Sequence, residues 1–423
     1  MRITGIIAEY NPFHNGHAFQ LAQAKTETDA DYVVIIMSGN FVQRGAPALL
    51  DKFVRAKMAL LEGADLVIEL PALWSCASAE YFAGAGIALL SQLGCIDTLC
   101  YGCETPSAGV FSKICEILTD EPPLYRQLLT DRLRAGCGFA RARADALLAL
   151  LPESAVSDAA AVLKHPNNIL ALEYHKAAAL ESFQNHTTAI RMHPILRQGQ
   201  GYHSSLLQDS MSSASAIRQF LAGHPPEPEY SRTLFHVMPD GARRLLLDYE
   251  ACYPFLYEND CSQMLHYCLL KNAADGFSAY ADCTPELSNR ICHHLYDYTG
   301  FTDFCTHLKS KDLAYTRISR VLLHILLDIR QDSYTYWRSR SYVPYARILG
   351  FRKESQALLK HLKKHTSIPL LTRAAGAEKI LRQPDAAAFF QNHLLTDAIY
   401  RALILEKGGR KIKNEYQQQL VVL

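Results

Sequence analysis

Two histidines near the start of the chain, His14 and His17, have a spacing that suits phosphate chemistry. They belong to the segment Glu9–His17 and would share one face of a helix, with Gly16 between them leaving the backbone open because it has no Cβ. A helix start also offers unpaired N–H groups and a partial positive charge to an anion. We therefore predict that both rings stabilise a phosphate that gains charge during reaction, without nucleophilic attack by histidine. The alternative is a helix cap with two surface histidines.

Two further segments carry groups that could hold phosphate oxygens. Near residue 215, hydroxyls at a predicted helix start are followed by an arginine, so that Ser213, Ser215 and Arg218 could hold a leaving diphosphate. An ordinary serine N-cap is the alternative there. Arg197 follows a predicted strand end, where its planar and permanently charged group suits phosphate.

Two amides and one glycine complete the set of candidate ligand contacts. Asn167 and Asn168 stand at the start of an apolar helix, a place where asparagine is more often a helix cap than a ligand contact. Gly102 ends a predicted strand, and its missing side chain would let a nucleoside lie against the backbone. Taken alone, Gly102 would be interpreted as a turn glycine.

The elements that must position these residues form an alternating pattern in residues 1–105. Short apolar runs alternate with helical stretches, which is typical of a parallel α/β sheet. We expect a Rossmann-like fold, in which ligands bind at the carboxyl ends of the strands, where the histidine segment lies. A proline pair at 225–226 marks a boundary, so we predict an α/β domain at 1–222 and a mostly α-helical domain at 223–423. The expected strands are Ile3–Ala8, Tyr32–Met37, Leu66–Leu70 and Thr98–Tyr101, and the expected helices are Gly16–Lys25, Leu50–Glu62 and Ala79–Leu93.

The near-neutral charge of the whole chain conceals a basic segment. The 423 residues include 43 Lys and Arg and 42 Asp and Glu, a balance that on its own argues against a polyanionic partner. Residues 306–365, however, contain 13 basic and 4 acidic residues, a local charge of +9 that leaves −8 for the remainder. Aromatic residues are interleaved with these charges, as expected for binding of single-stranded RNA. The alternative is a helical domain with aromatic core residues and solvated charges, and an apolar stripe over 318–326 supports a buried face.

The overall composition excludes several classes of protein. With 49% hydrophobic and 20% charged residues, the chain is neither disordered nor a small disulfide-rich fold. The start leads directly into a strand, and no apolar run approaches the ~18 residues of a membrane span, so we expect a soluble, cytoplasmic protein with no membrane partner. Cys95, Cys100 and Cys103 have an iron–sulfur-like spacing without an obvious fourth ligand, and buried free thiols are the favoured interpretation. No metal ligand is identified.

The string His14-Asn15-Gly16-His17 resembles the HxGH signature of nucleotidyltransferases and class I aminoacyl-tRNA synthetases, enzymes that attack the α-phosphate of ATP and release diphosphate. More closely, the chain resembles the bacterial tRNA(Met) cytidine acetate ligase family. It departs from that pattern at Ala171, where Gly is usual, and at Ser204, where an Asp beside His203 is usual. The matching segments are Glu9–His17, Met37–Gly45, Arg55–Leu60, Asp65–Pro71, Pro166–Leu170, Arg197, Gly201–His203, Ser212–Arg218 and Tyr345–Phe351.

This resemblance implies an activity. The family member would be an ATP-dependent ligase that activates acetate as acetyl-adenylate and acetylates the wobble cytidine of elongator tRNA(Met) to N4-acetylcytidine, releasing AMP and diphosphate. Residues 1–222 would bind ATP and carry out catalysis, residues 223–423 would bind tRNA, and Mg²⁺ is expected to offset the triphosphate charge. Two alternatives stay open: an adenylyltransferase acting on a small metabolite, and a non-catalytic RNA-binding protein.

The resemblance also implies roles for individual residues. The expected catalytic residues are His14 and His17. The expected ATP contacts are Ile7, Ala8, Glu9, Tyr10, Asn11, Pro12, Phe13, His14, Asn15, Gly16, His17, Ala18, Phe19, Gln20, Gly102, Asn167, Asn168 and Arg197, with only one of the two asparagines needed. Ser213, Ser215 and Arg218 are the expected phosphate contacts. The expected tRNA contacts are Arg317, Arg320, Arg338, Arg340, Arg347, Arg352 and Lys353.

Overall fold

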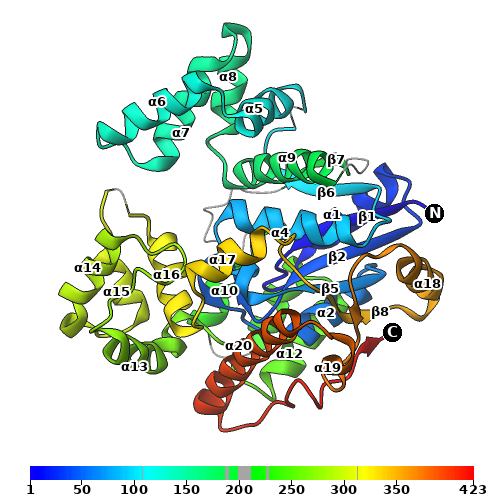
Figure 1. Ribbon diagram of the computed structural model, residues 1–423. Helices are drawn as coiled ribbons and strands as arrows, with labels where there is room; N and C mark the ends of the chain where they lie inside the picture. The colour runs from blue at the N-terminus through cyan, green and yellow to red at the C-terminus, as the bar shows by residue number, and fades with distance from the viewer. Residues whose placement is uncertain (107, 186–189, 199–210, 225–227, 312) are drawn as a thin grey trace.

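The fold is built around a mostly parallel sheet. The computed structural model describes residues 1–106, 108–185, 190–198, 211–224, 228–311 and 313–423. Its eight-stranded sheet has the order β10-β8-β5-β2-β1-β6-β7, with β9 paired to β8 (Figure 1). The order β5-β2-β1-β6-β7 is that of a Rossmann-like half, so the predicted fold class is confirmed. These strands are β1 (Ile3–Ala8), β2 (Tyr32–Ser38), β5 (Leu66–Leu70), β6 (Thr98–Cys103) and β7 (Arg191–Leu196).

Helices cover both faces of this sheet, which explains why its strands are continuous apolar runs instead of alternating ones. In β2, Val34 and Ile36 join one core together with α4 (Ala79–Gln92) and α9 (Pro166–Asn185). Val33, Ile35 and Met37 of the same strand join a second core with α1 (Asn15–Glu27) and α2 (Lys52–Leu61). The three helices predicted from the sequence are therefore present, and they enclose the sheet from both sides.

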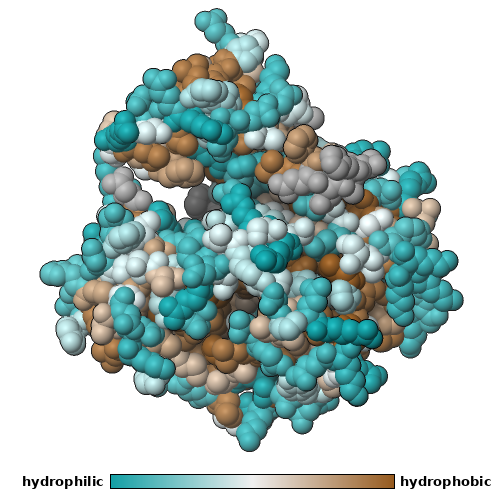
Figure 2. All heavy atoms as spheres, viewed as in Figure 1, coloured by the Kyte–Doolittle hydropathy of each residue, from teal (hydrophilic) through white to brown (hydrophobic). Residues whose placement is uncertain are grey.

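Two groups of helices extend from this central part. The first, inserted between β6 and β7, projects at the top of Figure 1 and consists of α5 (Ala108–Asp120), α6 (Pro123–Arg134), α7 (Phe139–Leu150) and α8 (Glu153–Val162). Apolar surface appears over this insertion in Figure 2, and Leu124, Leu133 and Phe139 are exposed large apolar side chains within it. The second, which we call the lower lobe, comprises η1 (Glu258–Cys261), α13 (Ser262–Asn272), α14 (Pro285–His293), η2 (Leu295–Asp297), α15 (Phe301–Leu308) and α16 (Tyr315–Leu326).

The C-terminal part of the chain returns to the sheet. Strand β8 (Ala346–Phe351) pairs antiparallel with β5, and β9 (Leu370–Leu371) and β10 (Val421–Val422) pair with β8. The division at residue 222 stays a prediction, although the part after it adds three strands to the sheet edge. The other elements of the described residues are β3 (Phe41–Val42), β4 (Ala46–Pro47), α3 (Ala72–Ser75), α10 (Ala214–Gly223), α11 (Pro228–Val237), α12 (Asp240–Glu250), α17 (Gln331–Arg338), η3 (Lys353–Ser355), α18 (Gln356–His365), α19 (Ala377–Ile380) and α20 (Pro384–Gly408).

The structure also shows the state of the cysteines and the character of the helices. The twelve cysteines are all free thiols, and Cys100 and Cys103 are buried on β6 as the thiol interpretation requires. Among the helices of the described residues, none combines the length and the apolar character needed to cross a bilayer.

Candidate nucleotide-binding site

A cavity of about 200 Å³ opens at the carboxyl edge of the sheet, where β1 lies beside β6. Most of the predicted ligand residues line it: Ile7, Ala8, Glu9, Tyr10, Asn11, His14, His17, Gln20, Gly102, Asn167, Arg197, Ser213, Ser215 and Arg218. Gly16 and Phe19 line a smaller cavity next to it. Residues drawn from five separate segments of the sequence therefore meet in one place.

The two histidines cap helix α1 with one nitrogen each. His14 Nδ1 accepts a hydrogen bond from the Gly16 backbone at 3.0 Å, and His17 Nδ1 accepts one from the His14 backbone at 3.3 Å. The rings stack with centroids 3.8 Å apart. Because each Nδ1 accepts, each neutral ring carries its hydrogen on Nε2. Helix capping and donation toward the cavity are thus compatible, so the two interpretations of the sequence do not exclude each other.

The same rings are held uncharged. Burial lowers the pKa of His14 to about 3, with Arg197 and Arg218 adding to the effect. Burial, His14 and Arg197 lower the pKa of His17 well below its ordinary value. Near neutral pH both side chains are therefore neutral Nε2–H donors, which suits stabilisation of charge that develops on an anion.

Aromatic residues of the motif support the histidines from the protein interior. Tyr10 and Phe13 are fully buried, and their ring centroids lie 4.8 and 5.5 Å from that of His17. Phe13 is thus in the core and does not line the cavity, which corrects its predicted contact with ATP. Pro12, Asn15 and Ala18 do not line it either, and the Asn15 amide donates to the His236 carbonyl at 3.0 Å.

Two arginines approach the histidines from β7 and α10. A Cβ added to Gly102 would lie 3.3 Å from Arg197 Cγ, so the glycine makes room for this arginine as well as for a ligand. Arg218 Nη1 donates to the Asn11 carbonyl at 2.6 Å, which joins α10 to the histidine segment. Ser213 Oγ caps α10 by accepting the Ala216 N–H at 3.2 Å. The predicted serine cap is present, and it leaves Arg218 facing the cavity.

The two asparagines have different roles. Asn168 is fully buried and its Oδ1 accepts the backbone N–H groups of Glu104 and Thr105 at 2.9 and 3.3 Å. It therefore holds the loop after β6. Asn167 lines the cavity, with its Nδ2 bound to Glu104 Oε1 at 2.5 Å. Of the predicted pair, Asn167 is the one that can reach a ligand.

Gln43 and Arg44 also line the cavity, although neither is among the predicted ligand contacts. They occupy the turn between β3 and β4, and the Gln43 N–H donates to Glu9 Oε1 at 2.9 Å. Both residues fall inside the matching segment Met37–Gly45, which was the available signal. The rest of the cavity wall, for which the sequence predicted no ligand contact, is aromatic and apolar: Phe82, Tyr101, Leu170 and Tyr174, with Ala214 beside the serines.

Elements from the far end of the chain hold this turn. Gly45 has a φ of +80°, and a Cβ there would collide with the backbone of Ser319 and Arg320 on α16. Ser319 Oγ donates to the Gly45 carbonyl at 2.9 Å, and Tyr400 on α20 donates to the Ala48 carbonyl at 2.9 Å. The Gln43–Arg44 turn is therefore fixed by helices that follow it by more than 270 residues.

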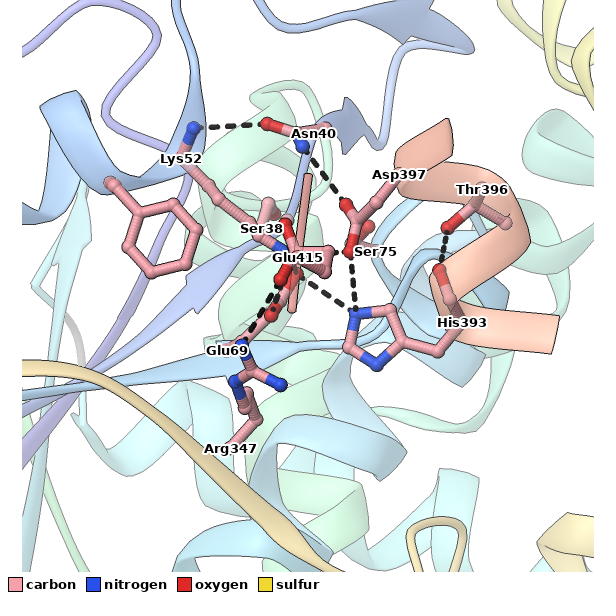
Figure 3. A network of polar contacts seen from close by, with 12 residues as sticks. Ser38, Asn40, Lys52, Glu69, Ser75, Arg347, His393, Thr396, Asp397 and Glu415 are labelled. Carbon is pink, nitrogen blue, oxygen red and sulfur yellow. Dashed lines mark hydrogen bonds and ion pairs between the residues drawn. The ribbon is translucent and has the colours of Figure 1, made fainter. Parts of the chain in front are cut away.

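A buried ionic cluster lies beside Asn40, just before this hairpin (Figure 3). Lys52 Nζ lies 2.8 Å from Glu69 and 2.5 Å from Asp397, and all three side chains are nearly inaccessible to solvent. His393 Nε2 is 2.9 Å from Glu69. Burial raises the pKa of Asp397, whereas for Glu69 the same effect is outweighed by His393 and Lys52, so its pKa is lowered. The cluster connects α2 and β5 of the N-terminal part to α20.

Arg55 fastens the strand ends on which the cavity is built. Its side chain is fully buried and donates to the carbonyls of Glu9 at 2.7 Å and Ser38 at 3.0 Å, and also to that of Gly39. These carbonyls lie at or just after the ends of β1 and β2. Arg55 thus sets the separation of the two loops that carry Glu9 and Gln43.

The predicted RNA-binding residues do not form one surface. Arg338 and Arg340 are exposed on and beside α17, and the Arg340 guanidinium lies 3.8 Å from the Tyr336 ring centroid. Arg317 is half-buried, and Arg320 is only 16% exposed, 3.6 Å from Asp282. Of these predicted RNA contacts, Arg338 and Arg340 are accessible, whereas Arg317 and Arg320 are accessible only in part.

One predicted RNA contact needs correction, and two others lie far from the cavity. Arg347 is buried and pairs with Glu415 at 3.1 Å, so it cannot meet RNA. Because β8 runs antiparallel to β5, the chain after it emerges at the amino edge of the sheet, opposite the cavity. Arg352 N–H donates to the Asp65 carbonyl there, and Lys353 N–H to that of Leu423. Arg352 and Lys353 therefore lie away from the cavity. The matching segment Gly201–His203 falls outside the described residues.

Comparison with known proteins finds one family model and a set of relatives that share one name. The family model HIGH Nucleotidyl Transferase matches residues 1–416. The tRNA(Met) cytidine acetate ligase of Clostridium kluyveri is 37% identical over 381 residues, 88% of this chain and 90% of that protein. That of Halothermothrix orenii is 36% identical, over 88% and 87% of the two chains.

Solved structures agree with these relatives. The crystal structure of Thermotoga maritima TmcAL bound with alpha-thio ATP is 25% identical, and the match covers all of both chains with a TM-score of 0.89. The apo form of the same protein gives 0.91 at 25% identity, again with full coverage of both chains. The chain therefore belongs to the HIGH nucleotidyl transferases and, among them, to the tRNA(Met) cytidine acetate ligase family.

Proposed function

We propose that this chain is an ATP-dependent ligase that activates acetate as acetyl-adenylate and transfers the acetyl group to the wobble cytidine of elongator tRNA(Met). The observation that carries the proposal is the pair of neutral Nε2–H donors of His14 and His17, set beside Arg197 and Arg218 at the carboxyl edge of β1 and β6. The relatives named for this activity, and the Thermotoga relative with its bound ATP analogue, support it.

The cavity divides by chemistry into two parts. Gly102 and Asn167, at the β6 side, offer an open backbone and an amide for the nucleoside of ATP. The histidines and the two arginines offer donors and positive charge for the triphosphate. A magnesium ion would offset part of the negative charge of the triphosphate. Its usual ligands are carboxylate and phosphate oxygens. Among the described residues lining the cavity, Glu9 is the only carboxylate, and it is the side chain that would hold the ion.

The reaction then has two steps. In the first, an acetate oxygen forms a bond to the α-phosphorus while the bond from that phosphorus to the diphosphate oxygen breaks. His14 and His17 donate to the oxygens on which charge builds up, and Arg197 and Arg218 hold the departing diphosphate. In the second, the N4 amine of cytidine attacks the acetyl carbon, the bond to AMP breaks, and one amine proton is lost. The products are N4-acetylcytidine, AMP and diphosphate.

The RNA substrate would approach over α17. Arg338 and Arg340 are exposed there, and both lie over tyrosine rings, Tyr81 and Tyr336. Arginines and rings of this kind can contact the phosphates and unpaired bases of a loop. Helix α17 is joined to the cavity wall, because Arg338 is 3.3 Å from Glu80 at the start of α4, two residues before Phe82. We expect this activity in the cytoplasm, where tRNA and ATP are available.

The direct test is to incubate the full chain with ATP, labelled acetate and bulk tRNA, and then to analyse the nucleosides. Labelled N4-acetylcytidine that depends on ATP is the expected product, together with AMP. A His17→Ala variant should lose it. An absence of acetylcytidine in the presence of a bound nucleotide would contradict the proposal, as would undiminished product from His17→Ala.

A further inference from the structure

Outside the nucleotide site, three metal-ligating side chains converge on the surface of the lower lobe. His294 is the C-cap residue that follows α14, Asp297 lies in the short helix η2, and His307 lies in the last turn of α15. Their donor atoms all lie within 4.8 Å of one another. The chemistry assigned to the nucleotide site uses none of them.

One ring nitrogen of this trio lies within hydrogen-bonding distance of two other potential acceptors. His294 Nδ1 lies 3.0 Å from Asp297 Oδ2 and 2.9 Å from His307 Nε2. His307 Nε2 is itself 3.6 Å from Asp297 Oδ2. If His294 Nδ1 carries a hydrogen, that hydrogen must serve both neighbours. If it carries none, its lone pair faces the carboxylate.

A divalent cation would satisfy all three atoms at once, because each can then act as a ligand. Two imidazole nitrogens and one carboxylate oxygen are a ligand set that Zn²⁺ accepts. Ligands at zinc bond lengths in a tetrahedron are separated by about 3.3–3.6 Å. The three observed separations of 2.9, 3.0 and 3.6 Å reach that geometry with shifts of a few tenths of an ångström.

The backbone under the trio is held by the core of the lobe. Leu295 follows His294 directly, and Leu308 follows His307 directly, and both side chains are buried. The N–H of Asp297 donates to the His294 carbonyl at 3.0 Å. The ligand-bearing residues therefore start from fixed positions, and only their side chains must adjust to bind an ion.

The other His–carboxylate cluster of the described residues behaves differently. Glu69, His393 and Asp397 also bring their donor atoms together, but Lys52 Nζ already lies 2.8 and 2.5 Å from the two carboxylates. An ammonium group thus occupies the position that a cation would take. The lobe cluster is accessible, since both histidines and Asp297 are partly or largely exposed.

We propose that His294, Asp297 and His307 form a binding site for a divalent transition-metal ion, with Zn²⁺ as the ion that fits best. A bound ion would link the end of α14, η2 and the end of α15, and would leave one coordination position to water. The site is independent of the nucleotide cavity and of the activity proposed above.

The test is a titration of the metal-free full chain with Zn²⁺ and, in parallel, with Co²⁺. We expect a bound equivalent that raises the melting temperature of the chain. His307→Ala and Asp297→Asn should each weaken Zn²⁺ binding by at least about tenfold, since even outer-shell changes cost that much. Co²⁺ bound here should show d–d absorption without thiolate charge transfer, which separates this site from the twelve free cysteines.

A matched control is the double variant His361→Ala/His365→Ala, which removes another pair of neighbouring histidine rings, on α18. It should bind Zn²⁺ like the wild type. The proposal is overturned if His307→Ala and Asp297→Asn, shown by circular dichroism to be folded, bind Zn²⁺ as tightly as the wild type. Cobalt spectra with thiolate bands alone would also overturn it.

Discussion

Asn40 and Asp397, which are 357 positions apart in the sequence, are joined by a hydrogen bond of 2.9 Å between the Asn40 amide and the Asp397 carboxylate. Asn40 directly precedes the hairpin that carries Gln43 and Arg44 into the cavity, and Asp397 lies on the last long helix. The same Asn40 side chain accepts the Lys52 N–H at 2.9 Å. The geometry of the nucleotide cavity therefore depends on the end of the chain.

Removal of the Lys52 charge should destabilise the whole fold. Lys52→Met leaves Glu69, Asp397 and Glu415 buried together without the ammonium that lies within 3.3 Å of each. Breaking a buried ionic group in this way typically costs about 3–5 kcal/mol of unfolding free energy. Urea denaturation followed by circular dichroism measures the loss. Lys57→Met on the same helix is the matched control and should cost less than about 1 kcal/mol; equal losses in the two variants would show that the ion pairs contribute nothing.

Substitution of His14 by asparagine should separate helix capping from catalysis. Asparagine is a good N-cap residue, so His14→Asn retains an acceptor for the Gly16 N–H while it loses the Nε2–H donor. We expect the unfolding free energy to change by less than about 1 kcal/mol. The rate of acetate-dependent exchange between ATP and diphosphate should fall about 10²–10³-fold, as for the loss of one donor to a developing charge. A His14→Asn enzyme with normal exchange would reduce the histidine to a helix cap.

The lowered pKa of His14 predicts a stability that depends on acidity. In the unfolded chain a histidine titrates near 6.5, whereas the folded value is about 3. Between these values the unfolded state binds more protons, so the stabilisation is fully present above pH 6.5 and is lost as the pH falls toward 3. By pH 5 this single group costs about 2 kcal/mol relative to pH 7.

The variant His14→Asn isolates that contribution, because it has no titrating group at position 14. Unfolding free energies of the wild type and the variant should be measured at pH 7 and at pH 5. The wild type should lose more stability than the variant over this interval. If both lose the same amount, His14 is protonated in the folded state or is not buried as described.

Much of the sheet and of the histidine site could be predicted from the sequence, because both depend on local signals. Strands buried on two faces are continuous apolar runs, and β1 and β5 begin and end at the predicted residues. His14, Gly16 and His17 lie within four positions of one another, so a single helix start determines their relation. The serine cap at Ser213 is equally local.

What sequence reasoning missed depends on contacts between distant segments. In the sequence, Arg347 is one more cation of a basic segment. Only the antiparallel pairing of β8 with β5 shows that its side chain is buried beside Glu415. The ring of Tyr345, one of the aromatic residues within the basic segment 306–365, is likewise buried and hydrogen-bonded to His393. The roles of Asn167 and Asn168 differ because the loop after β6 folds over one of them. No local pattern carries this information.

The corrected map of cations predicts which arginines affect tRNA affinity. Arg338→Ala and Arg340→Ala each remove an exposed cation beside a ring, so each should weaken tRNA binding and reduce the slope of log affinity against log salt by up to about 1. Arg352→Ala, at the opposite edge of the sheet, should change neither quantity. Filter binding of tRNA at several salt concentrations measures all three variants. Because a slope counts phosphate contacts, an unchanged slope for both Arg338→Ala and Arg340→Ala would exclude α17 from the RNA path, and a reduced slope for Arg352→Ala would place RNA on the other side of the sheet.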